Sequence, residues 1–263
     1  VASADVMAGA GGDWAAFLSG GIDSSSATAL LARHQPALRT YTLGTEHGDE
    51  YADAAALAGH LGLRHAQVFA TTEQARAHFD RAVRENETVD GLTGETLAQL
   101  AILAGAAAAD GARRVVTGYG ADLLFGSMLR HELYMKVTGV DDLQSLIERT
   151  MWSGEFAPFY AWSLGVEVHH LFWDPAVMNA AFRIPPEHSF DGTHEKLVLR
   201  RLMVDRGHLR AEHAFRKKQA LTDGTQFNRV LSTALGLPDK HAYGGKNHAA
   251  IAVLRRTFGV GHP

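Results

Sequence analysis

The chain of 263 residues is long enough for one large domain or two unequal ones, and 46% of its residues are apolar, enough for a full core. The formal net charge of −4 argues against a broad nucleic-acid-binding surface, and the absence of cysteine excludes disulfides, cysteine–zinc sites and thiol catalysis. No apolar run of about 18 residues indicates a membrane span, and the N-terminus lacks the order of a signal peptide, so we expect a cytoplasmic protein.

The first half of the chain alternates short apolar runs with helical patterns. Residues 1–13 are rich in Gly and Ala and are expected to be a linker or a frayed start. Strands are expected at residues 14–18, 38–43, 65–69 and 114–117, and helices at 24–33, 49–61 and 95–110. Strands that alternate with helices predict an α/β fold in which helices cover both faces of a parallel sheet.

The second half of the chain shows helical patterns only. After residue 127 no segment has a strand pattern, and helices are expected at residues 141–149, 175–182, 196–205 and 227–235. We therefore expect one domain over residues 14–263, composed of an α/β half (14–127) and a mostly helical lobe (128–263). Near the end of the chain, Gly244-Gly245-Lys246 is typical of a mobile segment.

A glycine-rich string, SGGIDSS at residues 19–25, separates the first expected strand from the first expected helix. Gly20 and Gly21 allow positive φ angles and a close backbone approach, so that successive N–H groups face one concavity at a helix N-terminus, where anions bind. Asp23 would repel phosphate unless Mg²⁺ lies between the two. The string predicts a site for phosphates and Mg²⁺; the alternative is a turn whose Ser or Asp caps the helix. The Gly-Lys-Ser/Thr end of a Walker loop is missing.

A second glycine-containing loop, Gly118-Tyr119-Gly120-Ala121-Asp122, follows the last expected strand. Ligands of parallel sheets bind beyond the carboxyl ends of the strands, so this loop and the first are expected to face one site. Asp122 would then add a second carboxylate to the Mg²⁺ that Asp23 holds, and the two glycines would fix the direction of Tyr119. The alternative is an ordinary connection whose Tyr covers the sheet edge.

These two strings resemble the signatures of the N-type ATP pyrophosphatases, which cleave ATP between its α- and β-phosphates. The second string is similar to that of the asparagine synthetase-like members, and a Tyr at position 119 resembles the β-lactam and carbapenam synthetases, since asparagine synthetases carry Glu there. The Lys-x-x-Leu-Arg string at residues 196–200 matches the family as well. The resemblance implies the PP-loop ATP pyrophosphatase fold, which is adenine nucleotide α hydrolase-like.

The resemblance also implies catalytic residues. In the β-lactam synthetase branch a Tyr paired with a Glu removes a proton from the attacking nitrogen, which points to Tyr119 and Glu155, with Glu167 as an open alternative. Lys218 matches the Lys that stabilises the developing charge, and the adjacent Lys217 is the alternative. The residues expected to bind ATP are Leu18, Ser19, Gly20, Gly21, Asp23, Ser24, Leu43 and Gly118.

The reaction that this resemblance implies is an AMP-forming carbon–nitrogen ligation. A substrate carboxylate would be adenylated, and an amine of the same small molecule or peptide would then close an amide. The alternatives are an intermolecular or macrolactam-forming synthetase, an ammonia-dependent enzyme of the asparagine synthetase type, and a non-catalytic ATP-binding subunit of a two-chain complex. A glutaminase-like N-terminal domain or chain is an expected partner and a homo-oligomer is left open, whereas nucleic-acid and membrane partners are not expected.

Overall fold

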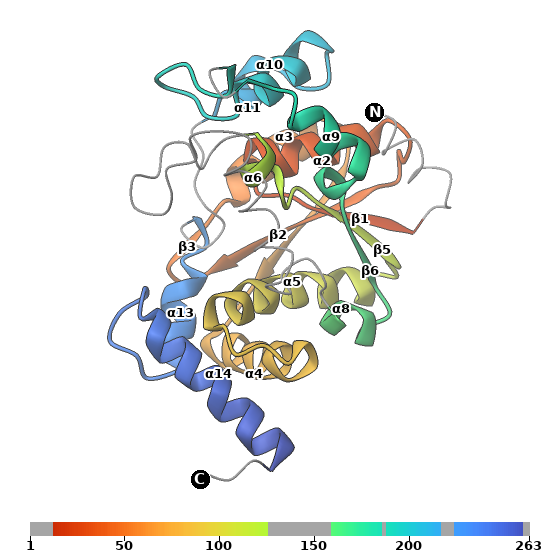
Figure 1. Cartoon of the computed structure of the whole chain (residues 1–263). Helices are drawn as coiled ribbons and strands as arrows, with labels where there is room; N and C mark the ends of the chain where they lie inside the picture. Colours follow the sequence, from red (N-terminus) through yellow and green to blue (C-terminus); the bar gives the residue numbers. More distant parts are fainter. Residues whose placement is uncertain (1–12, 126–158, 186–187, 217–223, 260–263) are drawn as a thin grey trace.

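The fold is built on a central six-stranded sheet (Figure 1). A computed structural model describes residues 13–125, 159–185, 188–216 and 224–259. The strands are β1 (Trp14–Phe17), β2 (Arg39–Thr45), β3 (Gly48–Asp49), β4 (Arg64–Phe69), β5 (Arg114–Thr117) and β6 (Glu167–His170). Four of the expected strands are therefore present close to their expected bounds.

Strand order places β1 at the centre of the sheet. It pairs in parallel with β2 on one side and with β5 on the other. Outside these, β4 is parallel to β2, β6 is parallel to β5, and the short β3 runs antiparallel to the end of β2. The chain proceeds outward from β1 in one direction through β2 and β4, and later in the other through β5 and β6. The order therefore switches between β1 and β5, where open α/β sheets bind ligands.

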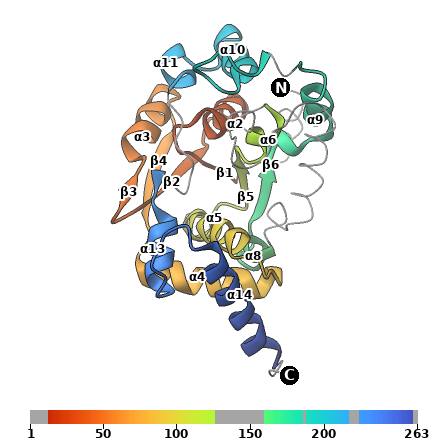
Figure 2. The same ribbon diagram turned by 60° about the vertical axis from the view of Figure 1, so that its left-hand side comes forward.

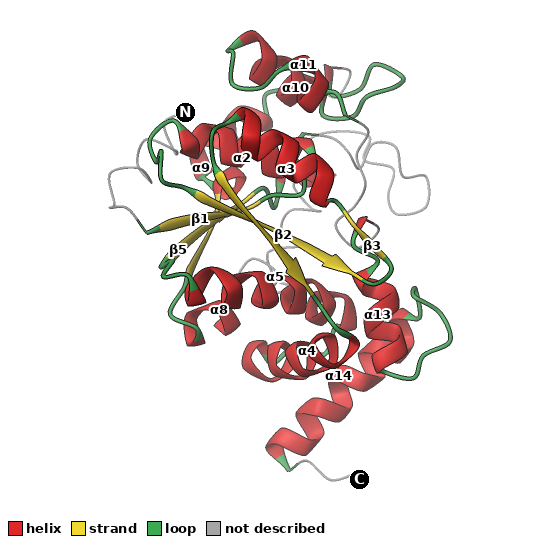
Figure 3. Cartoon of the chain, turned by 180° about the vertical axis from the view of Figure 1, so that it is seen from behind, coloured by secondary structure: helices red, strands yellow, loops and turns green. Residues whose placement is uncertain are grey.

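Helices cover both faces of the sheet, as Figure 3 shows. On one side lie α2 (Ile22–Ala32), α3 (Tyr51–His60), α6 (Ala121–Leu124), α9 (Pro175–Ala181), α10 (Leu197–Asp205) and α11 (Ala211–Ala214). On the other lie α4 (Thr72–Asn86), α5 (Gly91–Ala109), α8 (Phe159–Ser163), α13 (Phe227–Ala234) and α14 (Tyr243–Phe258). The expected α/β fold with helices on both faces is confirmed, and the sheet is parallel as expected except at the short β3.

The alternating side chains of β1 separate two hydrophobic cores. Ala15 and Phe17 face the core under α4 and α5, whereas Trp14, Ala16 and Leu18 face the core under α2 and α3. A strand with both faces buried is apolar at every position, because successive side chains point to opposite sides. This explains why the run WAAFL has no polar residue.

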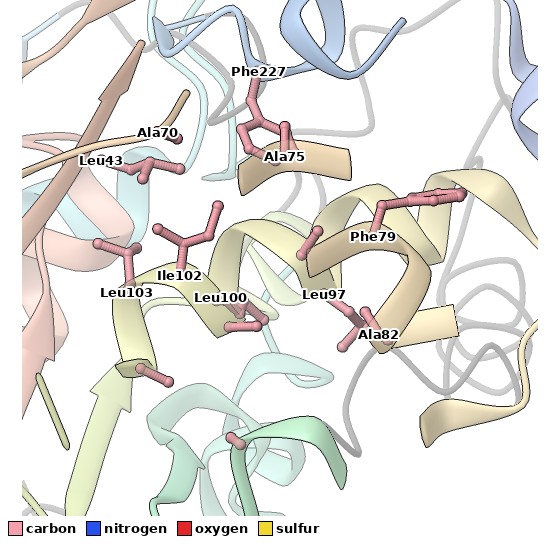
Figure 4. Close-up of a cluster of buried hydrophobic side chains, with 14 of the residues drawn as sticks. Leu43, Ala70, Ala75, Phe79, Ala82, Leu97, Leu100, Ile102, Leu103 and Phe227 are labelled. Carbon is pink, nitrogen blue, oxygen red and sulfur yellow. The ribbon is translucent and has the colours of Figure 1, made fainter. Parts of the chain in front are cut away.

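Helix α5 fills the larger core, and Figure 4 shows its side chains against β2, α4 and α13. Gly94 lets α4 approach closely, because a Cβ atom there would lie 2.8 Å from the Phe79 ring. Among the described residues α5 is the one helix long and apolar enough to cross a membrane, yet 67% of its apolar window is buried inside the protein. The apolar side chains of α5 thus pack in the hydrophobic core of the domain.

Two expectations about the second half of the chain are wrong. A strand does follow residue 127: β6 is an edge strand, and its sequence Glu-Val-His-His lacks an apolar run because its side chains are only partly buried. The segment at 244–246 begins α14 instead of forming a mobile loop. Figure 2 shows α14 beside α4, and Lys246 is fully buried there in an ion pair with Glu95 of α5. The helix expected at 141–149 lies outside the described residues.

Candidate active site

The first glycine-rich loop, which contains the SGGIDSS string, leaves β1 and turns sharply into α2. Gly20 has a φ angle of +75°, and a Cβ atom there would lie 2.9 Å from Asp53 Cβ and from Arg216 Nη1, so the turn needs glycine on two grounds. The Ser24 hydroxyl accepts from the Ser19 N–H at 3.1 Å and donates to the Gly21 carbonyl at 3.2 Å. The alternative interpretation, a plain turn, requires a Ser or Asp at the N-cap of α2. The N-cap residue is instead Gly21, and no side chain caps the helix.

The second loop packs directly on the first. A Cβ atom at Gly118 would collide with the backbone of Asp23 and Ser24 and would lie 2.7 Å from the Asp23 carbonyl oxygen. Gly120, with a φ angle of +93°, then turns the chain into α6, whose first turn carries Asp122. The two glycine-rich strings, about a hundred positions apart in the sequence, therefore form one surface at the switch point of the sheet.

A pocket opens where these loops meet the ends of β1, β2 and β5. Most of the residues expected to bind ATP line it, namely Leu18, Ser19, Gly21, Asp23, Ser24, Leu43 and Gly118, together with Tyr119 and Asp122. Gly20 shapes the turn and is not part of the lining. Apolar walls come from Phe17 and Tyr41 of the sheet and from Leu100 and Leu103 of α5. The pocket thus has a polar rim of loop residues and an apolar interior, as sites for small molecules commonly do.

Lys196 joins two of the acidic residues that line the pocket, Asp23 and Asp122. Its ammonium group contacts the carboxylate of Asp23 and lies 2.6 Å from that of Asp122. The Lys196 side chain is fully buried, whereas those of Asp23 and Asp122 are 16% and 44% exposed. The sequence did not assign this role, although the Lys-x-x-Leu-Arg string that contains Lys196 was itself a signal.

Arg200, one helical turn after Lys196, ties that segment to a third loop. Its guanidinium donates to the carbonyl oxygens of Glu195 at 2.7 Å and Arg216 at 3.2 Å, and also to that of Ala214. Burial lowers the pKa of Arg200, although the charge of Asp23 opposes this shift. The Lys-x-x-Leu-Arg spacing therefore places the Lys196 ammonium group on the two carboxylates. It places the Arg200 guanidinium on the carbonyl oxygens of the segment that contains Arg216.

Arg216 in turn contacts the first glycine-rich loop. It forms an ion pair with Asp53 and donates to the Ser19 carbonyl at 3.4 Å, and its Nη2 lies 3.7 Å from the Glu50 carboxylate. Lys217 and Lys218, which follow it, lie outside the described residues, as does Glu155. The described chain resumes at Gly224, where a Cβ atom would lie 2.7 Å from the Glu50 side chain. The positions that flank residues 217–223 therefore both adjoin the pocket residue Glu50.

Tyr119 is held by Thr117 and His170. Its N–H donates to the Thr117 hydroxyl at 3.2 Å, and that hydroxyl lies 2.6 Å from Nδ1 of His170. The rings of Tyr119 and His170 are tilted against each other with centroids 5.4 Å apart. Burial lowers the pKa of His170 to about 4, so the imidazole is neutral near pH 7. The carboxyl end of β6 thus supplies a wall behind Tyr119, which the sequence did not reveal.

Glu167, the alternative to Glu155, does not belong to this site. Glu167 is in register with Arg114 at the amino end of β5, whereas Thr117 and Tyr119 lie at the carboxyl end of that strand. Its side chain is 63% exposed and lies 3.4 Å from the Arg114 guanidinium. A carboxylate at the amino end of a parallel strand cannot serve a pocket at the carboxyl end, which excludes Glu167 as the partner of Tyr119 in this arrangement.

Comparison with known proteins agrees with this geometry. The asparagine synthase family model matches residues 8–154 and 159–236. The carboxyethyl-arginine beta-lactam-synthase of Streptomyces clavuligerus is 30% identical over 253 residues, which cover 94% of this chain and 48% of that protein. Asparagine synthetase B [glutamine-hydrolyzing] of Escherichia coli is 24% identical, with coverage of 81% and 42%. The chain therefore spans about half the length of these relatives.

A solved structure of a predicted subunit of tRNA methyltransferase from Methanocaldococcus jannaschii aligns with 79% of this chain and 94% of its own, at 14% identity and a TM-score of 0.37. The family match covers most of the chain and includes both glycine-rich strings. The switch-point pocket, its paired carboxylates and this match together show that the chain belongs to the asparagine synthase family.

Proposed function

We propose that this chain is the synthetase part of an ATP-dependent ligase that adenylates a substrate carboxylate, releases pyrophosphate and then forms an amide bond. The observation that carries the proposal is the contact between the two glycine-rich loops, which places Asp23 and Asp122 on one pocket. The SGGIDSS string resembles the loop of the N-type ATP pyrophosphatases and lacks the lysine of a Walker motif, and this resemblance supports cleavage between the α- and β-phosphates.

The pocket fits ATP with Mg²⁺. Among the residues that the structure describes, no group of three or more acidic or His side chains could hold a metal by itself. Mg²⁺ characteristically takes one or two carboxylates and completes its shell with phosphate oxygens and water, so Asp23 and Asp122 suit it. When bound, Mg²⁺ would neutralise charge on the phosphates. The N–H groups of the loop at Ser19–Ser24 and the N-terminus of α2 would hold the pyrophosphate, and Lys218 is the further residue proposed for that role.

For the second step we propose Tyr119 as the base that removes a proton from the attacking amine. A Tyr has an ordinary pKa near 10, so it needs neighbours that favour its anion. The neutral His170 beside it adds no positive charge, which leaves that task to cations at the pocket. Glu155 is the proposed partner of Tyr119. The hydroxyl of Thr117 holds the backbone N–H of Tyr119, so the phenol is directed by the loop.

The substrate most consistent with these features carries both the carboxylate and the amine. A Tyr between the two glycines and the 30% identity to a carboxyethyl-arginine beta-lactam-synthase support closure of an intramolecular amide. Amide formation with ammonia is the second candidate, favoured by the asparagine synthetase relatives that match 81% of the chain. Ammonia would then be delivered by a glutaminase-like domain or chain, since this sequence contains no cysteine.

The products of ATP test the proposal directly. Incubation with ATP, Mg²⁺ and candidate amino-carboxylate substrates should give AMP and pyrophosphate in equal amounts, resolved by ion-exchange chromatography. Asp23→Asn and Asp122→Asn are the matched variants, and each should lose metal-dependent turnover while it keeps the wild-type circular dichroism spectrum. ADP as the main nucleotide product would refute cleavage between the α- and β-phosphates.

A further inference from the structure

We propose that Lys196 is a resident counter-ion for Asp23 and Asp122, which keeps the two carboxylates together before ATP arrives and gives up at least one of them to the divalent cation. The inference rests on the proposed function, because it takes Asp23 and Asp122 as the metal ligands. It assigns to Lys196 a positioning role in metal loading.

The geometry puts the ammonium group where a metal ion would have to bind. Lys196 Nζ contacts the Asp23 carboxylate and lies 2.6 Å from Asp122 Oδ1. Mg²⁺ needs carboxylate oxygens at about 2.0–2.1 Å in a near-octahedral shell. A cation that bridges Asp23 and Asp122 would therefore compete with the Lys196 ammonium for the same oxygens and would be repelled by it at short range.

The burial of Lys196 makes this competition strong. Its side chain is 0% exposed, so the charge cannot be balanced by water and depends on the two carboxylates. Asp122, in contrast, is 44% exposed and open to the pocket. Removal of the Lys196 charge would leave two carboxylates beside each other with one cation fewer, and such a pair attracts a divalent ion.

The backbone around Lys196 limits how far its ammonium group can move. Lys196 adopts a left-handed conformation, with φ +56°, which a non-glycine residue keeps only when its surroundings hold it. The next residue, Leu197, donates its N–H to the Ser189 carbonyl at 3.0 Å, and Arg200 holds the preceding carbonyl of Glu195 at 2.7 Å. A displaced ammonium group therefore stays close to Asp23 and Asp122, at the edge of the pocket that these two residues line, where the phosphate oxygens of an incoming nucleotide could receive it.

A loading order follows from these constraints. Free Mg²⁺ would have to displace Lys196 with no new anion to receive the ammonium, whereas Mg²⁺ bound to ATP brings phosphate oxygens that can receive it. The protein should thus bind the metal weakly alone and well together with the nucleotide. Lys196 would prevent the two carboxylates from trapping a divalent cation before the nucleotide binds.

The experiment is a titration with Mn²⁺ alone, without nucleotide or substrate, in which unbound Mn²⁺ is followed by its electron paramagnetic resonance signal. Lys196→Met should bind Mn²⁺ at least about tenfold more tightly than the wild type. This gain is a small fraction of the repulsion expected between a metal ion and an ammonium group in contact with it. Arg201→Met is the matched control, because it removes the same charge from an exposed position on α10, the helix that follows Lys196, and this variant should bind Mn²⁺ like the wild type. Lys196→Met combined with Asp122→Asn should lose the gain.

A Lys196→Met variant that binds Mn²⁺ no more tightly than the wild type overturns the inference, since a purely structural lysine would leave affinity unchanged or reduced. If Lys196→Met does not fold, as judged by circular dichroism, Lys196→Gln carries the same expectation, because its amide can donate to one carboxylate without charge. Wild-type protein that binds Mn²⁺ alone as tightly as Lys196→Gln would also overturn it. If the wild type forms AMP and pyrophosphate but Lys196→Met shows no gain in Mn²⁺ affinity, only the role of Lys196 is refuted. If the wild type forms ADP, the proposed function is refuted.

Discussion

Gly118→Ala should separate the two loops of the pocket by a defined distance. The added Cβ atom would lie 2.7 Å from the Asp23 carbonyl oxygen, which is 0.7 Å closer than the 3.4 Å of ordinary contact, and still closer to the backbone of Asp23 and Ser24. These neighbours are backbone atoms, which cannot rotate away as a flexible side chain can. One loop must therefore move by about 1 Å relative to the other, a displacement large enough to disturb reaction geometry.

The cost should appear in both stability and catalysis. Overpacking of a tight contact typically costs about 1–3 kcal/mol of unfolding free energy. A displacement of about 1 Å at a reaction centre lowers turnover by roughly a hundredfold, equivalent to about 2.7 kcal/mol in the activation free energy. We therefore expect Gly118→Ala to remain folded but to lose most of its pyrophosphate release, because the Asp23 and Asp122 carboxylates would no longer face one another correctly.

Urea unfolding and a pyrophosphate-release assay with MgATP and a turned-over substrate measure the two effects. Gly105→Ala is the matched control, because the same methyl group placed within α5 meets nothing within 4 Å. That substitution should stabilise the helix by about 0.5–1 kcal/mol and leave turnover unchanged. Gly118→Ala with wild-type turnover would show that the contact between the two loops is not needed for the reaction, which would remove the observation on which the proposed function rests.

Three further variants test other parts of the structure. Tyr119→Phe should retain ATP–pyrophosphate exchange but slow amide formation by roughly a hundred- to ten-thousand-fold, and equal loss of both would exclude Tyr119 as the base of the second step alone. Lys246→Met should reduce the unfolding free energy by about 3–5 kcal/mol, measured in urea, because it leaves Glu95 buried without its cation, and an unchanged value would contradict the buried ion pair. Burial lowers the pKa of His170 to about 4, against about 6.5 in the unfolded chain, so the unfolded state binds more protons between these pH values. The unfolding free energy should therefore fall as pH drops through this interval, by up to about 3–4 kcal/mol. His170→Gln should flatten that dependence of the urea midpoint on pH, whereas an unaltered slope would place the titration elsewhere.

Local patterns in the sequence were sufficient for the central strands and for both loops. The run WAAFL is typical of a strand with both faces buried, and the two glycines that follow Ser19 favour a sharp turn into the next helix. Parallel pairing then brings the ends of β1 and β5 to one edge, so the meeting of Gly118 with Asp23 was predictable in outline. These features depend on residues close together in the chain and on the geometry of parallel sheets.

Packing between distant segments decided the rest. The partly exposed β6 has no local signature, and its register alone removes Glu167 from the pocket and brings His170 behind Tyr119. Lys246 follows two glycines that are typical of a loop, yet it is a buried residue of α14. Its ammonium group forms an ion pair with Glu95, which lies 151 positions earlier in the chain.

The contact of Lys196 with Asp23 spans 173 positions and exists because α10 packs against α2. A lysine in a sequence carries no sign of which carboxylate it will meet, since an ion pair depends on where both backbones are placed. The sequence by itself predicted that two glycine-containing loops, each with an acidic residue, would meet at one site, and the structure brings Asp23 and Asp122 to one pocket. Only the tertiary structure decided that a buried ammonium group lies between those two carboxylates.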